Sequence, residues 1–189
     1  MVLSKMPTDI CGKKNIIRKL IKSRWKCVSA EVHSKYKRMV LEEISQSPLF
    51  RDAGTILIYH ADQFEIDLSG VLESFPEKRF GFPVIQEDMS MIFRLKTDDN
   101  FILGKYGIPV PPENNPEIPS EDVDLAFVPC QAIDSDNIRL GRGAGFYDRF
   151  LSKNGHLFPQ ITVVPFFSYY QHLPKEQTDI PVTHRIIIK

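Results

Sequence analysis

The N-terminal part of the chain repeats apolar and polar residues with the period of an α-helix. Between Lys13 and Cys27 the apolar residues recur every three or four positions, and basic residues fill most of the places between them. A second helical pattern follows Ser29, a good N-cap, and stops near Pro48, which cannot continue a helix. The pattern therefore predicts two consecutive amphipathic helices.

The pattern then changes to short runs rich in β-branched and aromatic residues. Residues 55–59 (TILIY) predict a buried strand, which a polar loop follows. Asp67 or Ser69 is placed to cap a short helix that reaches Phe75. The runs RFGFPVI and MSMIFRL predict two more strands. The order of elements is now strand, helix, strand.

The second half continues this alternation after a proline-rich stretch at 109–119, which predicts a surface loop rather than a domain boundary. Strand-like runs occur at 124–129, 161–167 and 184–189, and a helical segment at 146–153 ends before Gly155. Alternating strands and helices predict a mainly parallel sheet covered on both faces. We expect a single-domain, three-layer α/β/α fold over residues 1–189.

Composition places the chain among soluble globular proteins. Of its 189 residues, 42% are apolar and 25% are charged, a balance that supports a packed core. The 24 basic and 24 acidic residues cancel, so no overall field draws the protein to nucleic acid or to an anionic membrane. The segment 12–30 is locally basic, because it contains several lysine and arginine residues and no acidic residue.

The cysteines and the N-terminus indicate a compartment. Cys11, Cys27 and Cys130 are odd in number, widely spaced and free of any CxxC pair, which predicts neither a disulfide framework nor a structural zinc site. The N-terminal residues lack the apolar stretch of a signal peptide, and no apolar run is long enough to span a bilayer. We expect a cytoplasmic protein.

The most informative stretch is the glycine-rich run between Arg139 and Phe150. Alternate glycines at 141, 143 and 145 let backbone amides approach an anion, and the helix that follows aims its first amides at the same place. Arg142 adds a planar donor suited to phosphate, and Arg139 is placed to assist at the edge. The run matches neither a Walker A loop nor a dinucleotide-binding fingerprint. The alternative is an ordinary glycine-rich turn.

Other polar residues extend this hypothesis, and each has a simpler explanation. Asp148 follows the glycines, where a carboxylate beside phosphate needs a cation such as Mg²⁺, although a pairing with a neighbouring basic residue is equally ordinary. Lys14 and Arg18 share one helix face that grips phosphate or is merely solvated. Glu65 is a candidate acceptor for ring N–H groups, or a solvated loop carboxylate. Aromatic residues that would wall such a cleft, or simply fill the core, are Tyr59, His60, Phe146 and Tyr147.

Several separated motifs occur together in one order along the chain. Asp124-Leu125, Val128-Pro129 and Asp134 precede the run RLGRGAGFYDRFL. These motifs resemble the signature of the 5-formyltetrahydrofolate cyclo-ligase family, also called 5,10-methenyltetrahydrofolate synthetases. The likeness covers nearly the whole chain; further matching positions are Lys14, Arg18, Tyr59, Glu65-Ile66-Asp67, Pro83, Gly107-Ile108-Pro109, Gln171, Leu173-Pro174 and Asp179.

The resemblance implies an ATP- and Mg²⁺-dependent conversion of 5-formyltetrahydrofolate to 5,10-methenyltetrahydrofolate, with release of ADP and phosphate. It implies that Arg142 is the catalytic residue, that Asp148 and Asp179 hold Mg²⁺, and that His60 and Glu65 contact the folate, Glu65 through the pterin. The ATP-binding residues that it implies are Lys14, Arg18, Arg139, Leu140, Gly141, Arg142, Gly143, Ala144, Gly145, Phe146 and Tyr147.

The chain departs from the family pattern at a few positions. Cys130-Gln131 stands where Gly-Leu is usual, and Ala144 stands where lysine or glycine is frequent. Phe146 replaces a usual tyrosine, and Val84 a common basic residue. Without a loop lysine, Arg142 has to neutralise more of the negative charge of the phosphate. We expect slower turnover or altered affinity, and the same reaction. Cys130 is either a reactive thiol or, as we expect, a buried and inert one.

Two other functions remain open from the sequence. One is a sugar-phosphate or coenzyme A enzyme on a related α/β scaffold, because a fold alone does not define a function. The other is a non-catalytic RNA-binding protein that uses the basic first helix, although the chain is neutral overall and carries no single-strand-binding motif. Neither the residues nor the resemblance indicates an oligomeric state.

Overall fold

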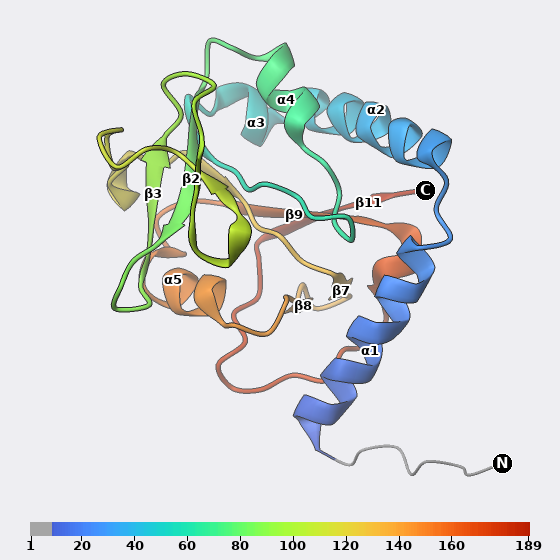
Figure 1. Ribbon diagram of the computed structural model, residues 1–189. Coiled ribbons are helices and arrows are strands. Elements are labelled where there is room, and N and C mark those ends of the chain that lie inside the picture. The colour runs from blue at the N-terminus through green and yellow to red at the C-terminus, as the bar shows by residue number, and fades with distance from the viewer. Residues whose placement is uncertain (1–8) are drawn as a thin grey trace, which may run out of the picture.

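A computed structural model of the protein describes residues 9–189. The first eight residues, part of the segment in which the sequence indicates no signal peptide, lie outside this range. A six-stranded sheet in the order β11-β9-β6-β1-β2-β3 forms the centre (Figure 1). Adjacent strands of this sheet are paired in parallel, except β2 and β3, which form an antiparallel hairpin. The strands are β1 (Thr55–Leu57), β2 (Arg79–Ile85), β3 (Met91–Leu95), β6 (Leu125–Phe127), β9 (Gln160–Pro165) and β11 (His184–Ile188).

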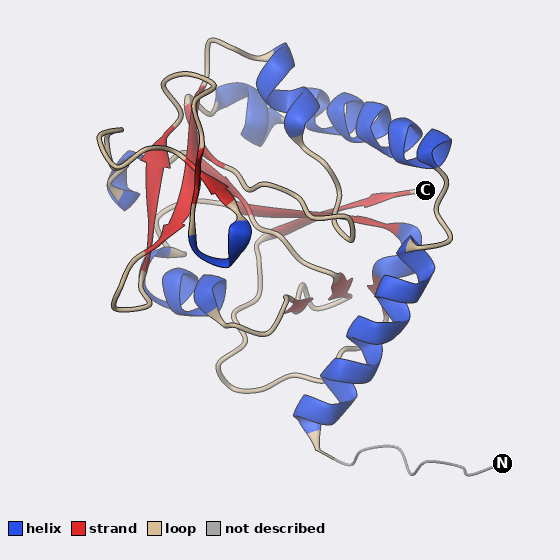
Figure 2. Cartoon of the chain, in the orientation of Figure 1, coloured by secondary structure: helices blue, strands red, loops and turns tan. Residues whose placement is uncertain are grey.

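Helices cover the two faces of this sheet, as the alternating pattern predicts (Figure 2). One face carries α2 (Ala30–Gln46), α3 (Pro48–Asp52) and α4 (Ser69–Ser74), and the other carries α5 (Phe146–Asn154). The long α1 (Ile10–Trp25) runs along the side of the molecule. Within the described residues, none of these helices has the length and apolar character needed to cross a bilayer.

The first two helices begin where their side chains cap them. Asp9 accepts the N–H of Gly12 at 2.7 Å, and Ser29 accepts the N–H of Val32 at 3.3 Å. Pro48 ends the second helical pattern as predicted, and it also begins the short α3 as its first residue. The predicted boundaries of α1 and α2 are therefore close to the observed ones.

Side chains that alternate along the strands divide the core into two clusters. Ile56 of β1 and Phe127 of β6 pack with Phe50 of α3 on one face. Leu57, the next residue of β1, packs with Phe150 of α5 on the other face. Because successive strand residues point to opposite faces, a sheet covered on both sides needs apolar residues at every position. The short apolar runs of the sequence meet this need.

A second, three-stranded sheet was absent from the sequence prediction. It consists of β10 (Tyr169–Tyr170), β7 (Ala132–Asp134) and β8 (Arg139–Leu140), in that order. Asp134 stabilises the turn between β7 and β8 by accepting the N–H groups of Asp136 and Ile138, and it also accepts that of Leu173. Strand β8 leads directly into the glycine loop, so this sheet positions the start of the loop.

Three local predictions were wrong in detail. The run 55–59 forms ladder pairs only at Thr55–Leu57. Neither Asp67 nor Ser69 caps the first turn of α4; Leu68 is its N-cap, and Asp67 instead accepts the N–H and hydroxyl of Ser69. The proline-rich loop contains the short strand β5 (Pro109–Val110), which pairs with β4 (Ile102–Leu103). Pro109 is tolerated in this ladder because it is the first residue of the strand, where its missing N–H costs no hydrogen bond.

Candidate active site

The glycine loop, residues 141–145, connects β8 to α5 along a path that requires glycine. Gly143 has a φ of 107°, and Gly145, the N-cap of α5, has a φ of 69°. Within residues 9–189 no side chain caps α5, so its first N–H groups are available to an anion. Arg18 lies against the loop, where its Nε donates to the carbonyl of Gly141 at 2.8 Å. The structure therefore brings α1 and the glycine loop together.

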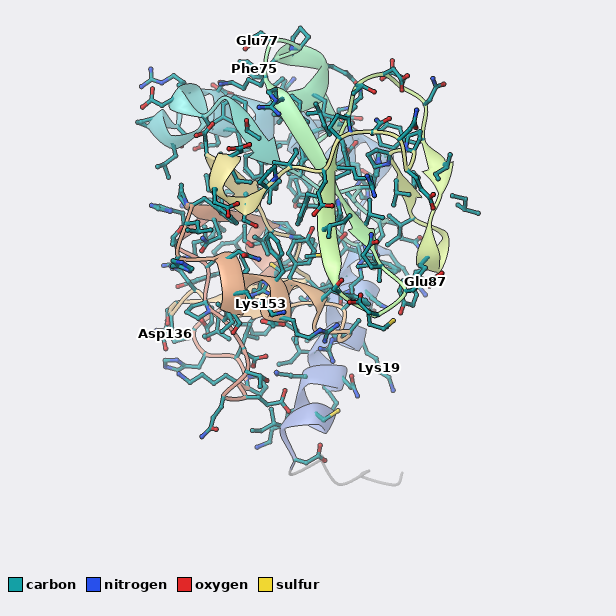
Figure 3. All side chains as sticks on the ribbon, turned by 90° about the vertical axis from the view of Figure 1, so that its left-hand side faces the viewer. Lys19, Phe75, Glu77, Glu87, Asp136 and Lys153 are labelled. Atoms are coloured by element: carbon teal, nitrogen blue, oxygen red, sulfur yellow. The ribbon has the colours of Figure 1, made fainter. Side chains whose placement is uncertain are left out.

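Lys14 joins the same face of α1 to the C-terminal loop. Its Nζ donates to Asp179 at 2.6 and 2.8 Å and to Glu176 at 2.9 Å. Burial alone would lower the pKa of Lys14, but the hydrogen bonds and charges of Asp179 and Glu176 raise it above the ordinary value. The side chain is 8% exposed, and Lys19 on the outer side of the same helix projects away from the fold (Figure 3). Lys14 is thus a buried, charged group at the site.

Arg139 and Asp148 form a second ion pair across the start of α5. Nη2 of Arg139 lies 3.0 Å from Oδ1 of Asp148, and Nη1 donates to the carbonyl of Ile180 at 2.6 Å. The same Asp148 oxygen accepts the N–H of Ile180 at 3.1 Å. The Arg139 side chain is only 3% exposed, so it holds the glycine loop to the C-terminal loop. Its contact with ATP stays a prediction, as does that of the buried Leu140.

Arg142 and Glu65 form the central contact of the site. Nε of Arg142 donates to Oε1 of Glu65 at 3.1 Å and Nη2 donates to Oε2 at 2.5 Å, a bidentate pair. Nη2 also lies 3.2 Å from Oδ2 of Asp62. The Glu65 side chain is 1% exposed and that of Arg142 is 39% exposed. Glu65 thus lies in a buried ion pair rather than in solvent, and its contact with a pterin stays a prediction.

The two pKa values of this pair follow from the difference in exposure. Burial raises the pKa of Glu65 above its ordinary value, although the hydrogen bonds and charge of Arg142 act against this rise. Burial lowers the pKa of Arg142, but the hydrogen bond and charge of Glu65 together with the charge of Asp62 raise it above its ordinary value, so Arg142 stays charged.

His60 occupies a different environment on the same loop as Glu65. Its ring stacks on Phe82 at a centroid distance of 4.4 Å and meets Phe101 edge-on at 4.8 Å. Its Nε2 is buried without a hydrogen-bond partner in residues 9–189, and burial lowers its pKa. Tyr59 belongs to the core, where its hydroxyl donates to the carbonyl of Ile66 at 3.3 Å. His60 thus holds a buried ring nitrogen that has no partner within residues 9–189, and its contact with the folate stays a prediction.

Aromatic residues line the beginning of α5. The ring centroids of Phe146 and Tyr106 lie 5.9 Å apart. Tyr147 carries a buried hydroxyl that has no hydrogen-bond partner in the described residues. Tyr106 is 66% exposed and has a φ of 62°. Sequence reasoning missed Tyr106, although its position directly before Gly107 in the matching turn was an available signal. Asp62 and Glu176 were also missed, because only the fold brings them to their cations.

The unusual pair Cys130-Gln131 lies buried at the end of β6. Cys130 is 4% exposed, and burial raises the pKa of its thiol well above the ordinary value. This confirms that Cys130 is a buried thiol. Gln131 is 2% exposed, and its Oε1 has no hydrogen-bond partner in the described residues. The departure from Gly-Leu therefore places a thiol and an amide in the buried segment between β6 and β7.

The two predicted Mg²⁺ ligands are already paired with cations. Asp179 contacts Lys14, and Asp148 contacts Arg139. The described residues contain no group of three or more His, Cys, Asp or Glu side chains suited to hold a metal. Oδ2 of Asp148, in a side chain 28% exposed, makes none of the hydrogen bonds in this range and remains available. The donor set thus fits a Mg²⁺ ion held largely by phosphate oxygens, which needs only one or two carboxylates.

Comparison with known proteins decides the family. The sequence model of the 5-formyltetrahydrofolate cyclo-ligase family matches residues 10–188. The chain belongs to this family. The match covers α1, the loop after β1, the glycine loop and the C-terminal loop, which together contain every residue of the site described above.

Two curated relatives of the cyclo-ligase family illustrate the degree of similarity. The 5-formyltetrahydrofolate cyclo-ligase of Mycolicibacterium smegmatis is 36% identical over 86 residues, which cover 44% of this chain and 43% of that protein. The enzyme of the same name from Haemophilus influenzae is 27% identical over 139 residues, covering 70% of this chain and 74% of that protein. The match to the first relative spans less than half of its length.

Solved structures confirm the α/β fold. A 5,10-methenyltetrahydrofolate synthetase from Aquifex aeolicus is similar with a TM-score of 0.82 and 25% identity, covering 92% of this chain and 89% of the other. A 5,10-methenyltetrahydrofolate synthetase from Mycoplasma pneumoniae is similar with a TM-score of 0.74 and 20% identity, covering 92% and 97%. The predicted fold class and the predicted family are therefore correct.

Proposed function

We propose that the protein converts 5-formyltetrahydrofolate to 5,10-methenyltetrahydrofolate in a reaction that consumes ATP and requires Mg²⁺. One observation carries the proposal within the family: Arg142 of the glycine loop meets Glu65 of the loop after β1 in a bidentate contact. A donor suited to phosphate and an acceptor suited to a pterin therefore lie side by side, as a transfer between ATP and a folate requires.

The chemistry divides into two steps. The formyl oxygen attacks the γ-phosphorus of ATP, the bond from that phosphorus to the β–γ bridging oxygen breaks, and ADP leaves. N10 then attacks the formyl carbon, the carbon–oxygen bond breaks with release of phosphate, and the N10 proton is lost as the methenyl bridge forms. Phosphorylation turns a poor leaving group into a good one, so the protein needs to supply position and charge rather than a nucleophile.

The residues of the site have matching roles in this proposal. Lys14, Arg18 and the glycine loop bind the triphosphate, and Arg142 stabilises the charge that develops on the transferred phosphoryl group. Glu65 accepts hydrogen bonds from the pterin, and His60 contacts the folate beside it. Arg139 keeps the loop in place from beneath, because its side chain is buried against Asp148 and Ile180.

Asp148 and Asp179 are the residues that would hold Mg²⁺. The ion supplies charge neutralisation on the β- and γ-phosphates when it is bound with ATP. Each carboxylate is now paired with a cation that can also bind phosphate. When the triphosphate binds, Lys14 would therefore exchange Asp179 for a phosphate oxygen and leave Asp179 free. Further elements of the proposal are a single domain over residues 1–189 and a cytoplasmic location, which the free thiols support.

A direct assay tests the proposal. Purified protein is mixed with 5-formyltetrahydrofolate, Mg²⁺ and ATP, and the near-ultraviolet absorbance of the methenyl product is followed together with ADP; a second reaction omits ATP. We expect equal rates of methenyl product and ADP, and no product without ATP. Arg142→Ala is expected to reduce turnover at least 100-fold, as removal of one charge-stabilising donor commonly does. A folded wild-type protein that forms no product would contradict the proposal.

A further inference from the structure

Arg142 and Glu65 occupy each other's binding faces in this structure. The Nε and Nη2 groups of Arg142 form its bidentate edge, and Glu65 uses both. Both oxygens of Glu65 are engaged in return, and Oε2 also accepts the N–H of Asp62 at 3.2 Å. Asp62 adds a second acceptor for Nη2 of Arg142. While the pair is intact, Glu65 therefore has both oxygens engaged, and Arg142 offers a substrate only the Nη1 side of its guanidinium.

Each partner also imitates the substrate group that the other is proposed to bind. The pyrimidine edge of a pterin presents a ring N–H and an exocyclic N–H side by side, as the guanidinium of Arg142 does. The Glu65 carboxylate presents two negatively charged oxygens to Arg142, as a phosphoryl group does. A triphosphate thus competes with Glu65 for Arg142, and a pterin competes with Arg142 for Glu65.

The surroundings allow this pair to open without unfolding the core. Arg142 is 39% exposed and belongs to a loop in which a Cβ at Gly141 would meet nothing within 4 Å. Glu65 is 1% exposed and stays in the wall of the site. The arginine is therefore the partner with space to turn toward a phosphate, while the carboxylate remains buried.

We infer that the Arg142–Glu65 pair is a latch that couples the binding of the two substrates. This inference rests on the proposed function, and it assigns to the pair a regulatory role in the same site. The first substrate to bind must break the pair, and the second then finds its partner already free. Each substrate therefore increases the affinity for the other by the same factor, as linkage requires. The protein accordingly favours the complex that contains both substrates.

Calorimetric titration of the full chain tests the latch with adenylyl imidodiphosphate and Mg²⁺, because this ATP analogue cannot donate its terminal group. The analogue is titrated into wild-type protein with and without saturating 5-formyltetrahydrofolate, and the reverse titration follows. We expect each ligand to lower the Kd of the other about tenfold, a typical coupling between sites. Independent or mutually weakened binding would overturn the inference.

Variants of the acidic loop separate the latch from a general charge effect. Glu65→Gln is expected to bind the analogue about tenfold more tightly than wild type in the absence of folate, because Arg142 is no longer held. Asp62→Asn should act in the same direction and more weakly. The matched control is Asp67→Asn, which removes one negative charge from the same loop and keeps the acceptor for Ser69. Its affinity for the analogue should equal that of wild type.

The outcomes also separate this inference from the proposed function. If wild-type protein forms product normally, and wild type and Glu65→Gln bind the analogue with equal affinity, the latch alone is refuted. Absence of any binding of the analogue to a folded wild-type protein would refute both. Equal tightening by Asp67→Asn and Glu65→Gln would assign the effect to charge and also refute the latch.

Discussion

The ammonium group of Lys14 lies 2.6 Å from the carboxylate of Asp179, a residue 165 positions further along the chain. The Lys14 side chain is 8% exposed and that of Asp179 12% exposed, so both charges are largely removed from water. Asp179 also accepts the N–H of Glu176 at 2.7 Å, which shapes the C-terminal loop. One pair of residues thus ties α1 to the last loop of the protein and places a cation at the site.

Replacement of Lys14 is expected to affect both stability and ATP binding. In Lys14→Met the Asp179 carboxylate is left buried without its partner, which should lower the free energy of unfolding by about 3 kcal/mol. The same variant should raise the KM for ATP. Urea unfolding and initial rates measure the two effects. Lys19→Met, an exposed position on the same helix, is the control and should change the stability by less than about 0.5 kcal/mol.

Substitution of Asp148 tests the proposed position of Mg²⁺. Asp148→Asn keeps an acceptor for Arg139 and Ile180 but removes the charge that a cation requires. We expect the Mg²⁺ concentration for half-maximal activity to rise about tenfold, with saturating metal restoring part of the rate. The exposed Asp122→Asn serves as a control. An unchanged Mg²⁺ dependence in Asp148→Asn would place the metal elsewhere.

The buried Glu65 predicts a pH dependence of stability. Because burial raises its pKa above the ordinary value of 4.5, the folded protein binds this proton more tightly than the unfolded chain. The contribution of protonated Glu65 to the free energy of unfolding is fully present below the ordinary pKa. It is lost as the pH rises through the raised pKa that Glu65 has in the folded protein. Relative to wild type, Glu65→Gln should therefore gain stability as the pH rises from about 4 toward neutrality.

Urea unfolding of both proteins at several pH values measures this difference, which levels off above the folded pKa. A difference that stays constant with pH, or one that shrinks as the pH rises, would show that the ion pair with Arg142 outweighs burial.

The three cysteines should separate into two classes of reactivity. Cys11 and Cys27 are exposed, whereas Cys130 is buried and burial raises the pKa of its thiol. With an aromatic disulfide reagent, two thiols should react rapidly in the folded protein and the third only after addition of denaturant. Cys130→Ala should show two reactive thiols in both conditions. Rapid reaction of all three in the folded wild type would be inconsistent with this structure.

Much of the local structure could be predicted from the chain because the signals are local. α1 and α2 have enough residues for a helical period to be recognised, and Ser29 and Pro48 mark their ends by their own chemistry. The strands of the central sheet are apolar at successive positions because both faces are covered. The run RLGRGAGFYDRFL predicted a glycine loop before a helix, because glycine adopts the positive φ values that Gly143 and Gly145 have there.

The partners of the charged residues could not be predicted in this way. Glu65 and Arg142 are 77 positions apart, and their contact depends on how the loops after β1 and β8 meet. The small sheet escaped prediction because its strands of two or three residues are too short to show a period. The sequence by itself determined α1, α2, α4 and α5, the central strands, the glycine loop and the family. Only the tertiary structure decided that Lys14, Arg139 and Arg142 each face a carboxylate, because long-range pairing depends on where distant loops converge.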